Sequence, residues 1–275
     1  KVFSLNALGV EGTTFGLAII NNVVVAAVLA PLVLADIYVG GLWLDALMLL
    51  AAGLMGWEWA RLCAGGKLLP GGYLVILVLV ALPLSFAFEL SQYVLFELLV
   101  GTLAVLFVNL VLHRGLALWF AAGTLYIGLA VVSFLWLRHV PEQGRALIFW
   151  ILAVVWTVDI GAYFAGRGIG GPKLAPSISP NKTWAGLIGG ALAAGLVSAL
   201  AAPWLDQQAL TLFLAGLAMA VVAQAGDLLE SACKRHFGVK DSSHLIPGHG
   251  GILDRVDGLL AVLPVVFVFV WVLEV

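Results

Sequence analysis

Uninterrupted apolar segments, each about as long as a membrane-spanning helix, recur along the whole chain. Residues 73–88 are one example, and they show no alternation of polar and apolar side chains. Crossing a bilayer takes about 20 helical residues, and lipid offers the backbone no hydrogen-bond partner, so such segments favour α-helices over a barrel. Only 10% of the 275 residues are Asp, Glu, Lys or Arg and 63% are apolar. The sequence therefore excludes a water-soluble domain and predicts an all-α integral membrane protein.

The apolar segments divide the chain into nine predicted spans joined by short polar connections. Little length remains for a soluble domain outside the membrane. The predicted spans are 17–35, 42–57, 73–88, 94–112, 116–137, 146–165, 184–202, 209–225 and 252–273.

Basic residues gather on one side of this predicted topology. Since Lys and Arg accumulate in cytoplasmic connections, the side that carries most of them is predicted to face the cytoplasm. Only Lys1, Arg138 and Arg145 fall on the other side, which places the N-terminus outside. Ten of the 13 basic residues occupy the even-numbered connections: Arg61, Lys67, Arg114, Arg167, Lys173, Lys182, Lys234, Arg235, Lys240 and Arg255.

Charge and cysteine content exclude two further classes of protein. The formal net charge of −2 provides no basic field that would attract nucleic acid. Cys63 and Cys233 lie far apart, without the paired spacing of a zinc site. Both are predicted to be buried free thiols.

Charged residues concentrate in residues 227–257, which hold nine of the 28 charged side chains and three of the five histidines. Asp227 directly follows an apolar run, and Asp254 and Asp257 begin the last one. Ionisable groups at membrane depth are costly and usually face a polar cavity. We expect such a cavity in the C-terminal half, facing the cytoplasm. If the eighth helix continues past residue 225, Asp227, Glu230, Ser231 and Lys234 share one face.

The three aspartates are candidate ligands for a metal ion. Asp254 and Asp257 share a helical face, and with Asp227 they could converge on a hard cation such as Mg²⁺ or Mn²⁺. Phosphoryl or nucleotidyl transfer requires such an ion beside basic residues, because the charge on phosphorus must be neutralised. The alternative is a plain ion network in which these acids pair with Arg235, Lys240 and Arg255.

Four further features are candidate parts of the site. The glycine-rich segment 166–171 and the polar segment 179–183 could hold phosphate, although a flexible connection and an ordinary helix cap explain them equally well. His249 lies in a tight turn and could act as an acid or base. Asp159 lies inside the sixth span and is expected to face the polar cavity. The small residues Gly186, Gly190 and Ala194 instead indicate close helix packing.

Three segments of residues 227–257 closely resemble the signature of the phosphatidate cytidylyltransferases, the CDP-diacylglycerol synthases. They are Ser231-Ala-Cys-Lys234-Arg235, Lys240-Asp241-Ser242-Ser243 and Pro247-Gly-His-Gly-Gly-Ile-Leu-Asp254-Arg255-Val-Asp257. The resemblance extends from about residue 146 to the end. Ala185 and Ser243 depart from the family pattern, which often has Glu and Gly there.

The resemblance implies that CTP and phosphatidic acid are the substrates and that CDP-diacylglycerol and pyrophosphate are the products. Residues 1–145 would be a scaffold and residues 146–275 a catalytic region. The implied metal ligands for Mg²⁺, with a second cation left open, are Asp227, Asp254 and Asp257. The implied catalytic residues are Lys234, Arg235, Lys240, Asp241, His249 and Arg255. The implied substrate-binding residues are Asp159, Ser179, Asn181, Lys182, Thr183 and Ser231.

Two other functions compete with this interpretation. A CDP-alcohol phosphotransferase would match Asp254, Asp257 and Gly258, but Val262 occupies the arginine position of its signature. A transporter of an anionic substrate would scatter polar residues along several spans, whereas here they concentrate in one segment. We expect a bacterial inner-membrane protein bound to the lipid bilayer, and the oligomeric state, including a homodimer, stays open.

Overall fold

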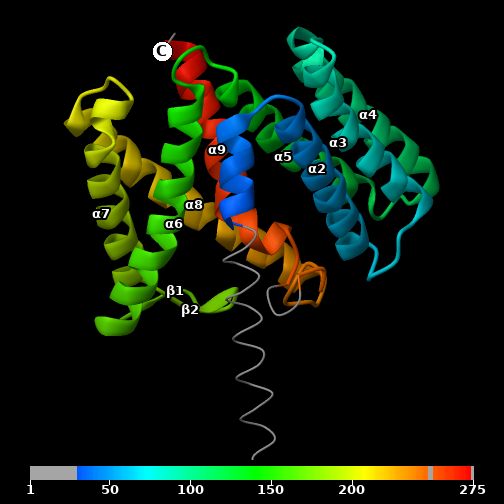
Figure 1. Ribbon diagram of the computed structural model, residues 1–275. Coiled ribbons are helices and arrows are strands. Elements are labelled where there is room, and N and C mark those ends of the chain that lie inside the picture. Colours follow the sequence, from blue (N-terminus) through cyan, green and yellow to red (C-terminus); the bar gives the residue numbers. More distant parts are fainter. Residues whose placement is uncertain (1–29, 247–249, 274–275) are drawn as a thin grey trace, which may run out of the picture.

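The computed structural model describes residues 30–246 and 250–273 (Figure 1). Within these residues, seven helices are long and apolar enough to cross a membrane, and two shorter apolar helices, Ala30–Val39 and α7, accompany them. The chain is therefore an all-α integral membrane protein apart from one small hairpin. The elements after Ala30–Val39 are α2 (Leu42–Cys63), α3 (Pro70–Ala87), η2 (Ser91–Tyr93), α4 (Val94–Leu112), α5 (Ala117–Arg138), α6 (Gly144–Gly168), β1 (Lys173–Ala175), β2 (Ser179–Thr183), α7 (Trp184–Leu200), η3 (Ala202–Trp204), α8 (Ala209–His236) and α9 (Leu253–Leu273).

Most helix limits lie close to the predicted spans. Helix α4 has the predicted limits, and the first predicted span, 17–35, lies largely outside the described residues. Two helices are much longer than predicted. Helix α2 continues six residues past Trp57, and α8 continues eleven residues past Ala225. Both extensions contain charged side chains that are buried. A hydropathy pattern predicts that a span ends where such charged residues begin.

The helices form two groups that meet at α5 and α9 (Figure 1). Helices α2, α3 and α4 pack around α5, whereas α6, α7 and α8 pack in sequence order beside α9. Helix α5 buries large side chains such as Phe120, Ile127 and Leu135. Cys63 and Cys233 are both buried and free, which confirms that prediction.

Strands β1 and β2 form an antiparallel hairpin between α6 and α7 that was not predicted. Lys173 pairs with Thr183, and Ala175 pairs with Ser179. The turn that leads into it contains Gly170 at φ +69° and Gly171 at φ +92°, a backbone conformation that glycine adopts without strain. The hairpin and the segment between α8 and α9 lie at the same end of the molecule (Figure 1).

Small residues let α6 and α7 approach closely. A Cβ atom on Gly190 would lie 2.7 Å from the carbonyl oxygen of Val158, and one on Gly161 would lie 3.0 Å from the Cα of Gly190. Gly186, Gly190 and Ala194 are all buried in α7. The prediction that they serve helix packing is confirmed.

Replacing Gly190 with leucine should destabilise the protein, because the new side chain would overlap the backbone of α6. Overpacking typically costs about 1–3 kcal/mol, so the thermal unfolding midpoint in detergent should fall by several degrees. Gly168→Ala is the matched control, since a Cβ atom there meets nothing within 4 Å. Equal unfolding midpoints for the two variants would contradict the packing assignment.

Candidate active site

The second half of α8 carries a row of polar side chains on one face. Ser231 Oγ donates a hydrogen bond to Asp227 Oδ1 at 3.3 Å, and Lys234 Nζ donates to Glu230 Oε1 at 3.1 Å. Each contact joins residues four apart, as expected for neighbours on a helix surface. Glu230 and Lys234 are buried. The stripe expected from the spacing is present because α8 continues through it.

Asp254 joins this row to the start of α9. Lys234 Nζ donates to Asp254 Oδ1 at 2.5 Å. Asp254 Oδ2 accepts from the backbone N–H and the hydroxyl of Ser242, both at 2.9 Å, and from the N–H of Gly251 at 2.8 Å. These donors compensate the cost of removing the carboxylate from water. Gly250, at φ +82°, leaves room for this carboxylate, because a Cβ atom there would lie 2.7 Å from Oδ2.

A glutamate from the N-terminal half of the chain completes this region. Glu58, in α2, is 0% exposed. Its carboxylate accepts hydrogen bonds from the backbone N–H groups of Ile252 and Leu253 at 2.9 and 2.8 Å. It also accepts from the hydroxyls of Ser242 at 3.4 Å and Ser243 at 2.6 Å. Glu58 therefore caps the N-terminus of α9, where a negative charge is favourable.

The sequence left the role of Glu58 undecided. The predicted span ends at Trp57, and by the sequence alone Glu58 could be either a helix cap or an interface charge. Apolar residues continue on both sides of it as far as Cys63, which is the signal that could have identified it as a buried charge. Ser243, which departs from the family pattern, donates a hydrogen bond from its hydroxyl to the Glu58 carboxylate.

A second polar group forms where β2 meets α8. Lys182, in β2, forms an ion pair with Asp227 Oδ2. Thr183 ends the strand and caps α7, because its hydroxyl oxygen accepts the N–H of Gly186 at 3.0 Å. The hydroxyl proton of Thr183 stays available to donate. Thr183 therefore both caps α7 and lines the adjacent cavity.

A cavity of about 590 Å³ lies beside the Lys182–Asp227 pair. Its walls come from α6, the hairpin, the start of α7 and the middle of α8, and they combine both signs of charge with amide and hydroxyl groups. The polar lining residues are Asp159, Tyr163, Arg167, Lys173, Asn181, Lys182, Thr183, Gln224 and Asp227. Arg167 Nη1 donates to the hydroxyl of Tyr163 at 2.8 Å.

Helices α8 and α9 cross closely near Asp227 and Asp257. A Cβ atom on Gly226 would lie 2.9 Å from the carbonyl oxygen of Asp257, so the crossing requires glycine there. The negative charges of Asp227 and Asp159 both act on Asp257. Carboxylates from α6, α8 and α9 are therefore near enough to influence Asp257 electrostatically.

The chain matches a known protein family over most of its length. The model of the Cytidylyltransferase family matches residues 20–273. This chain belongs to the cytidylyltransferase family. The match confirms the resemblance drawn from residues 227–257, and it spans both groups of helices.

Curated relatives carry the name phosphatidate cytidylyltransferase. The protein from Brucella suis biovar 1 (strain 1330) is 50% identical over 158 residues, which cover 55% of this chain and 56% of the relative. The protein from Bacillus subtilis (strain 168) is 43% identical over 152 residues, covering 53% and 55%. The protein from Rickettsia prowazekii (strain Madrid E) is 37% identical over 193 residues, covering 63% and 85%. The chain spans about half the length of the first two relatives.

The remaining candidate residues of this cytidylyltransferase-family chain are dispersed over the end of α8, the segment after it and the start of α9. Arg235, Lys240, Asp241 and Arg255 are exposed, and none forms a salt bridge within residues 30–246 and 250–273. Among the described residues, Asp227 pairs with Lys182 and Asp254 with Lys234, while Asp257 forms no salt bridge. The pairing with Arg235, Lys240 and Arg255 that the alternative ion network requires is therefore not found there. His249 lies outside the described residues.

The three predicted metal ligands do not converge on one point: Asp254 lies apart from Asp227 and Asp257. In the part of the chain that the structure describes, no group of three or more His, Cys, Asp or Glu side chains is close enough to hold a metal ion. Asp254 is engaged by Lys234, Ser242 and Gly251, whereas Asp227 pairs with Lys182 and Asp257 lies at the close crossing of α8 and α9. The spacing along the chain did not reveal this separation.

Replacing Glu58 with alanine should loosen the start of α9. The N–H groups of Ile252 and Leu253 would lose their acceptor, and leaving buried donors unsatisfied costs about 1–3 kcal/mol each. We expect a lower unfolding midpoint and faster amide hydrogen exchange at these two residues. Glu97→Ala is the control, because Glu97 accepts one hydrogen bond, from Ser85, on a distant helix. Unchanged exchange at Ile252 and Leu253 would show that Glu58 does not cap α9.

Proposed function

We propose that the chain transfers a cytidylyl group from CTP to phosphatidic acid, producing CDP-diacylglycerol and pyrophosphate. The observation that carries the proposal is the Lys234–Asp254 pair. It holds the family signature at the junction of α8 and α9, next to exposed cations and close to the polar cavity. The names of the relatives, which are 37–50% identical, support the same activity. Neither a transporter nor a CDP-alcohol phosphotransferase is favoured by the family match.

The reaction needs charge neutralisation more than it needs a base. An anionic oxygen of the phosphatidate monoester attacks the α-phosphorus of CTP and forms a new P–O bond. The bond from the α-phosphorus to the bridging oxygen breaks, and pyrophosphate leaves with that electron pair. Because nucleophile and leaving group are both anions, preorganised cations and hydrogen-bond donors lower the barrier.

The residues divide into two sets by their partners. Arg235, Lys240 and Arg255 form no salt bridge among the described residues, and we assign them to the triphosphate of CTP. Lys234 is already neutralised and would position the signature segment, with Asp241 and His249 as further catalytic residues of the proposal. The substrate-binding set that borders or adjoins the cavity is Asp159, Ser179, Asn181, Lys182, Thr183 and Ser231.

We propose Mg²⁺ as the cofactor, held by Asp227 and Asp257 with Asp254 at the neighbouring position. The acidic group supports this assignment, because the negative charges of Asp159 and Asp227 both act on Asp257 and Lys182 is the only described residue that forms a salt bridge with one of the three. Two carboxylates would leave the other coordination positions to water and phosphate. Oxygen ligands suit hard divalent cations. A bound Mg²⁺ would supply positive charge to the phosphates. The proposal allows for a second cation bound beside this Mg²⁺.

We further propose nine spans, with the active site facing the cytoplasm of a bacterial inner membrane. The basic residues support this orientation. The hairpin and the α8–α9 segment lie at one end of the molecule (Figure 1), and together with the helix ends beside them they carry most of the basic residues of the C-terminal half. Arg138 and Arg145 lie at the other end. A homodimer remains one arrangement to be tested by measuring the mass of the purified protein.

The purified full chain, supplied with labelled CTP, phosphatidic acid and Mg²⁺, should form a labelled CDP-lipid and release pyrophosphate. Thin-layer chromatography of the lipid fraction measures the product, and a chelator should abolish its formation. Formation of no CDP-lipid by folded protein, together with uptake of CTP or phosphate into proteoliposomes, would replace the enzyme proposal with the transporter.

Asp227→Asn and Asp254→Asn should each reduce turnover by ~10²–10³-fold or more, because Asp227 belongs to the proposed metal site and Asp254 holds Lys234 and the signature segment in place. Asp206→Asn is the matched control, since Asp206 is exposed in the connection before α8. Size-exclusion profiles and unfolding midpoints check that the variants remain folded. Near-normal turnover in Asp227→Asn would refute the metal assignment, and near-normal turnover in Asp254→Asn would refute the role of the Lys234–Asp254 pair.

A further inference from the structure

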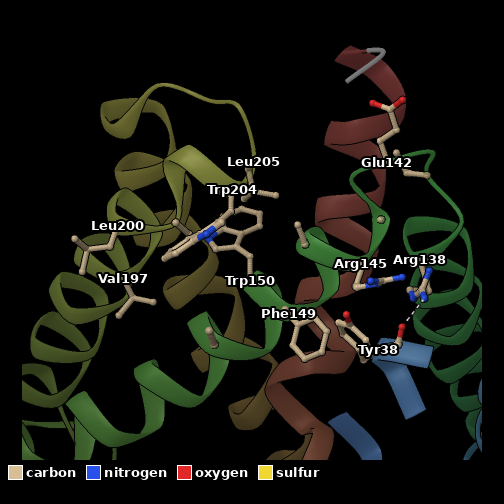
Figure 2. Close-up of a pocket in the computed structure, with 15 residues that line it drawn as sticks. Tyr38, Arg138, Glu142, Arg145, Phe149, Trp150, Val197, Leu200, Trp204 and Leu205 are labelled. Atoms are coloured by element: carbon tan, nitrogen blue, oxygen red, sulfur yellow. Dashed lines mark hydrogen bonds between the residues drawn. The ribbon is translucent and has the colours of Figure 1, made fainter. Parts of the chain in front are cut away.

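A second cavity lies at the opposite end of α6 from the candidate active site. Its volume is about 850 Å³, and none of its 15 lining residues borders the 590 Å³ cavity. Its walls come from the start of α6, the end of α7, the connections beside them and Tyr38 (Figure 2). The proposed reaction uses none of these residues.

One side of this cavity is cationic. Arg138 Nε donates to the carbonyl oxygen of Ile37 at 3.0 Å, which holds its guanidinium at the cavity edge. The guanidinium of Arg145 lies 4.4 Å from the ring centroid of Tyr38. Neither arginine forms a salt bridge with another described residue, and the carboxylate of Glu142 lies apart from both guanidinium groups (Figure 2). Within the described part of the chain, no salt bridge therefore neutralises the positive charge of the two arginines.

The other side of the cavity is apolar and aromatic. Phe149, Val197 and Leu200 line it, together with Trp150 and Trp204 (Figure 2). The indole N–H of Trp150 is already satisfied by the hydroxyl of Ser198 at 3.1 Å. Leu200 and Trp204 are 72% and 75% exposed, so this wall opens toward the surrounding lipid. Tryptophan at the ends of spanning helices marks the level of the lipid headgroups.

We propose that this cavity binds an anionic phospholipid, with its phosphate beside Arg138 and Arg145 and an acyl chain along Phe149, Val197 and Leu200. Charge complementarity selects this occupant. A guanidinium donates two parallel hydrogen bonds to a phosphate, and basic pockets between spanning helices suit anionic headgroups. Free phosphate would leave the apolar wall uncovered, and a zwitterionic lipid would bring a cation toward the arginines.

The bound lipid would contact three elements of the fold at once. Arg145 lies at the start of α6, Tyr38 lies in the short helix Ala30–Val39, and Leu200 ends α7. A ligand that binds only the folded protein stabilises it by mass action. The unfolding midpoint should therefore rise as the lipid is added.

Native mass spectrometry of the full chain in detergent, titrated with dihexanoyl phosphatidylglycerol, tests the proposal. We expect one saturable adduct and a rise in the unfolding midpoint, with dihexanoyl phosphatidylcholine at least about 10-fold weaker. Arg145→Gln should weaken phosphatidylglycerol binding about 10-fold or more, since it removes charge-assisted hydrogen bonds. Ala153→Phe, which fills the apolar side, should weaken it without changing charge.

Two control variants separate this cavity from other surfaces. Arg61 lies at the end of α2 with its guanidinium 4.6 Å from the ring centroid of Trp57, so Arg61→Gln removes a similar arginine elsewhere and should leave binding unchanged. Lys182→Gln alters the candidate active site and should also retain the adduct. Loss of the adduct in Lys182→Gln would place the lipid in the active site instead. Equal binding of phosphatidylcholine, full competition by inorganic phosphate or normal binding by Arg145→Gln would each overturn the proposal.

Discussion

Charged groups that lie at membrane depth need partners inside the protein, because lipid and packed helices supply no water to solvate them. Glu58, Lys234 and Asp254 meet this requirement together. Glu58 caps α9 and binds the serines of the preceding segment, and Asp254 binds Lys234 and the same segment. This network connects α2, α8 and α9. The position of the family signature depends on it.

The salt bridges also distinguish two kinds of basic side chain, paired and unpaired. Lys182 and Lys234 are neutralised by Asp227 and Asp254, so they contribute positioning and leave less net charge for a ligand. Arg235 and Arg255 are exposed and form no such pair among the described residues. The distinction between paired and available cations gives the proposed chemistry a physical basis. Counting basic residues alone could not make it.

The limits of several helices were predictable because hydropathy alone decides them. Helix α4 contains no buried charge that would interrupt its apolar run, and its limits match the prediction. Helices α2 and α8 were predicted too short, because Glu58 and Lys234 are charged yet buried. Their burial depends on partners far away in sequence. The β1–β2 hairpin was missed for a related reason, since its strands are short and polar and carry no apolar alternation.

The amino-acid sequence by itself determined the membrane environment, the helical class, the concentration of charge in residues 227–257 and the family resemblance. These properties follow from local composition and from the order of residue types. Only the tertiary structure decided which charges meet. It paired Lys182 with Asp227 and Lys234 with Asp254, brought Glu58 from α2 to the start of α9, and separated Asp254 from the Asp227–Asp257 crossing. Partners that lie up to 195 residues apart are set by helix packing, which no local pattern encodes.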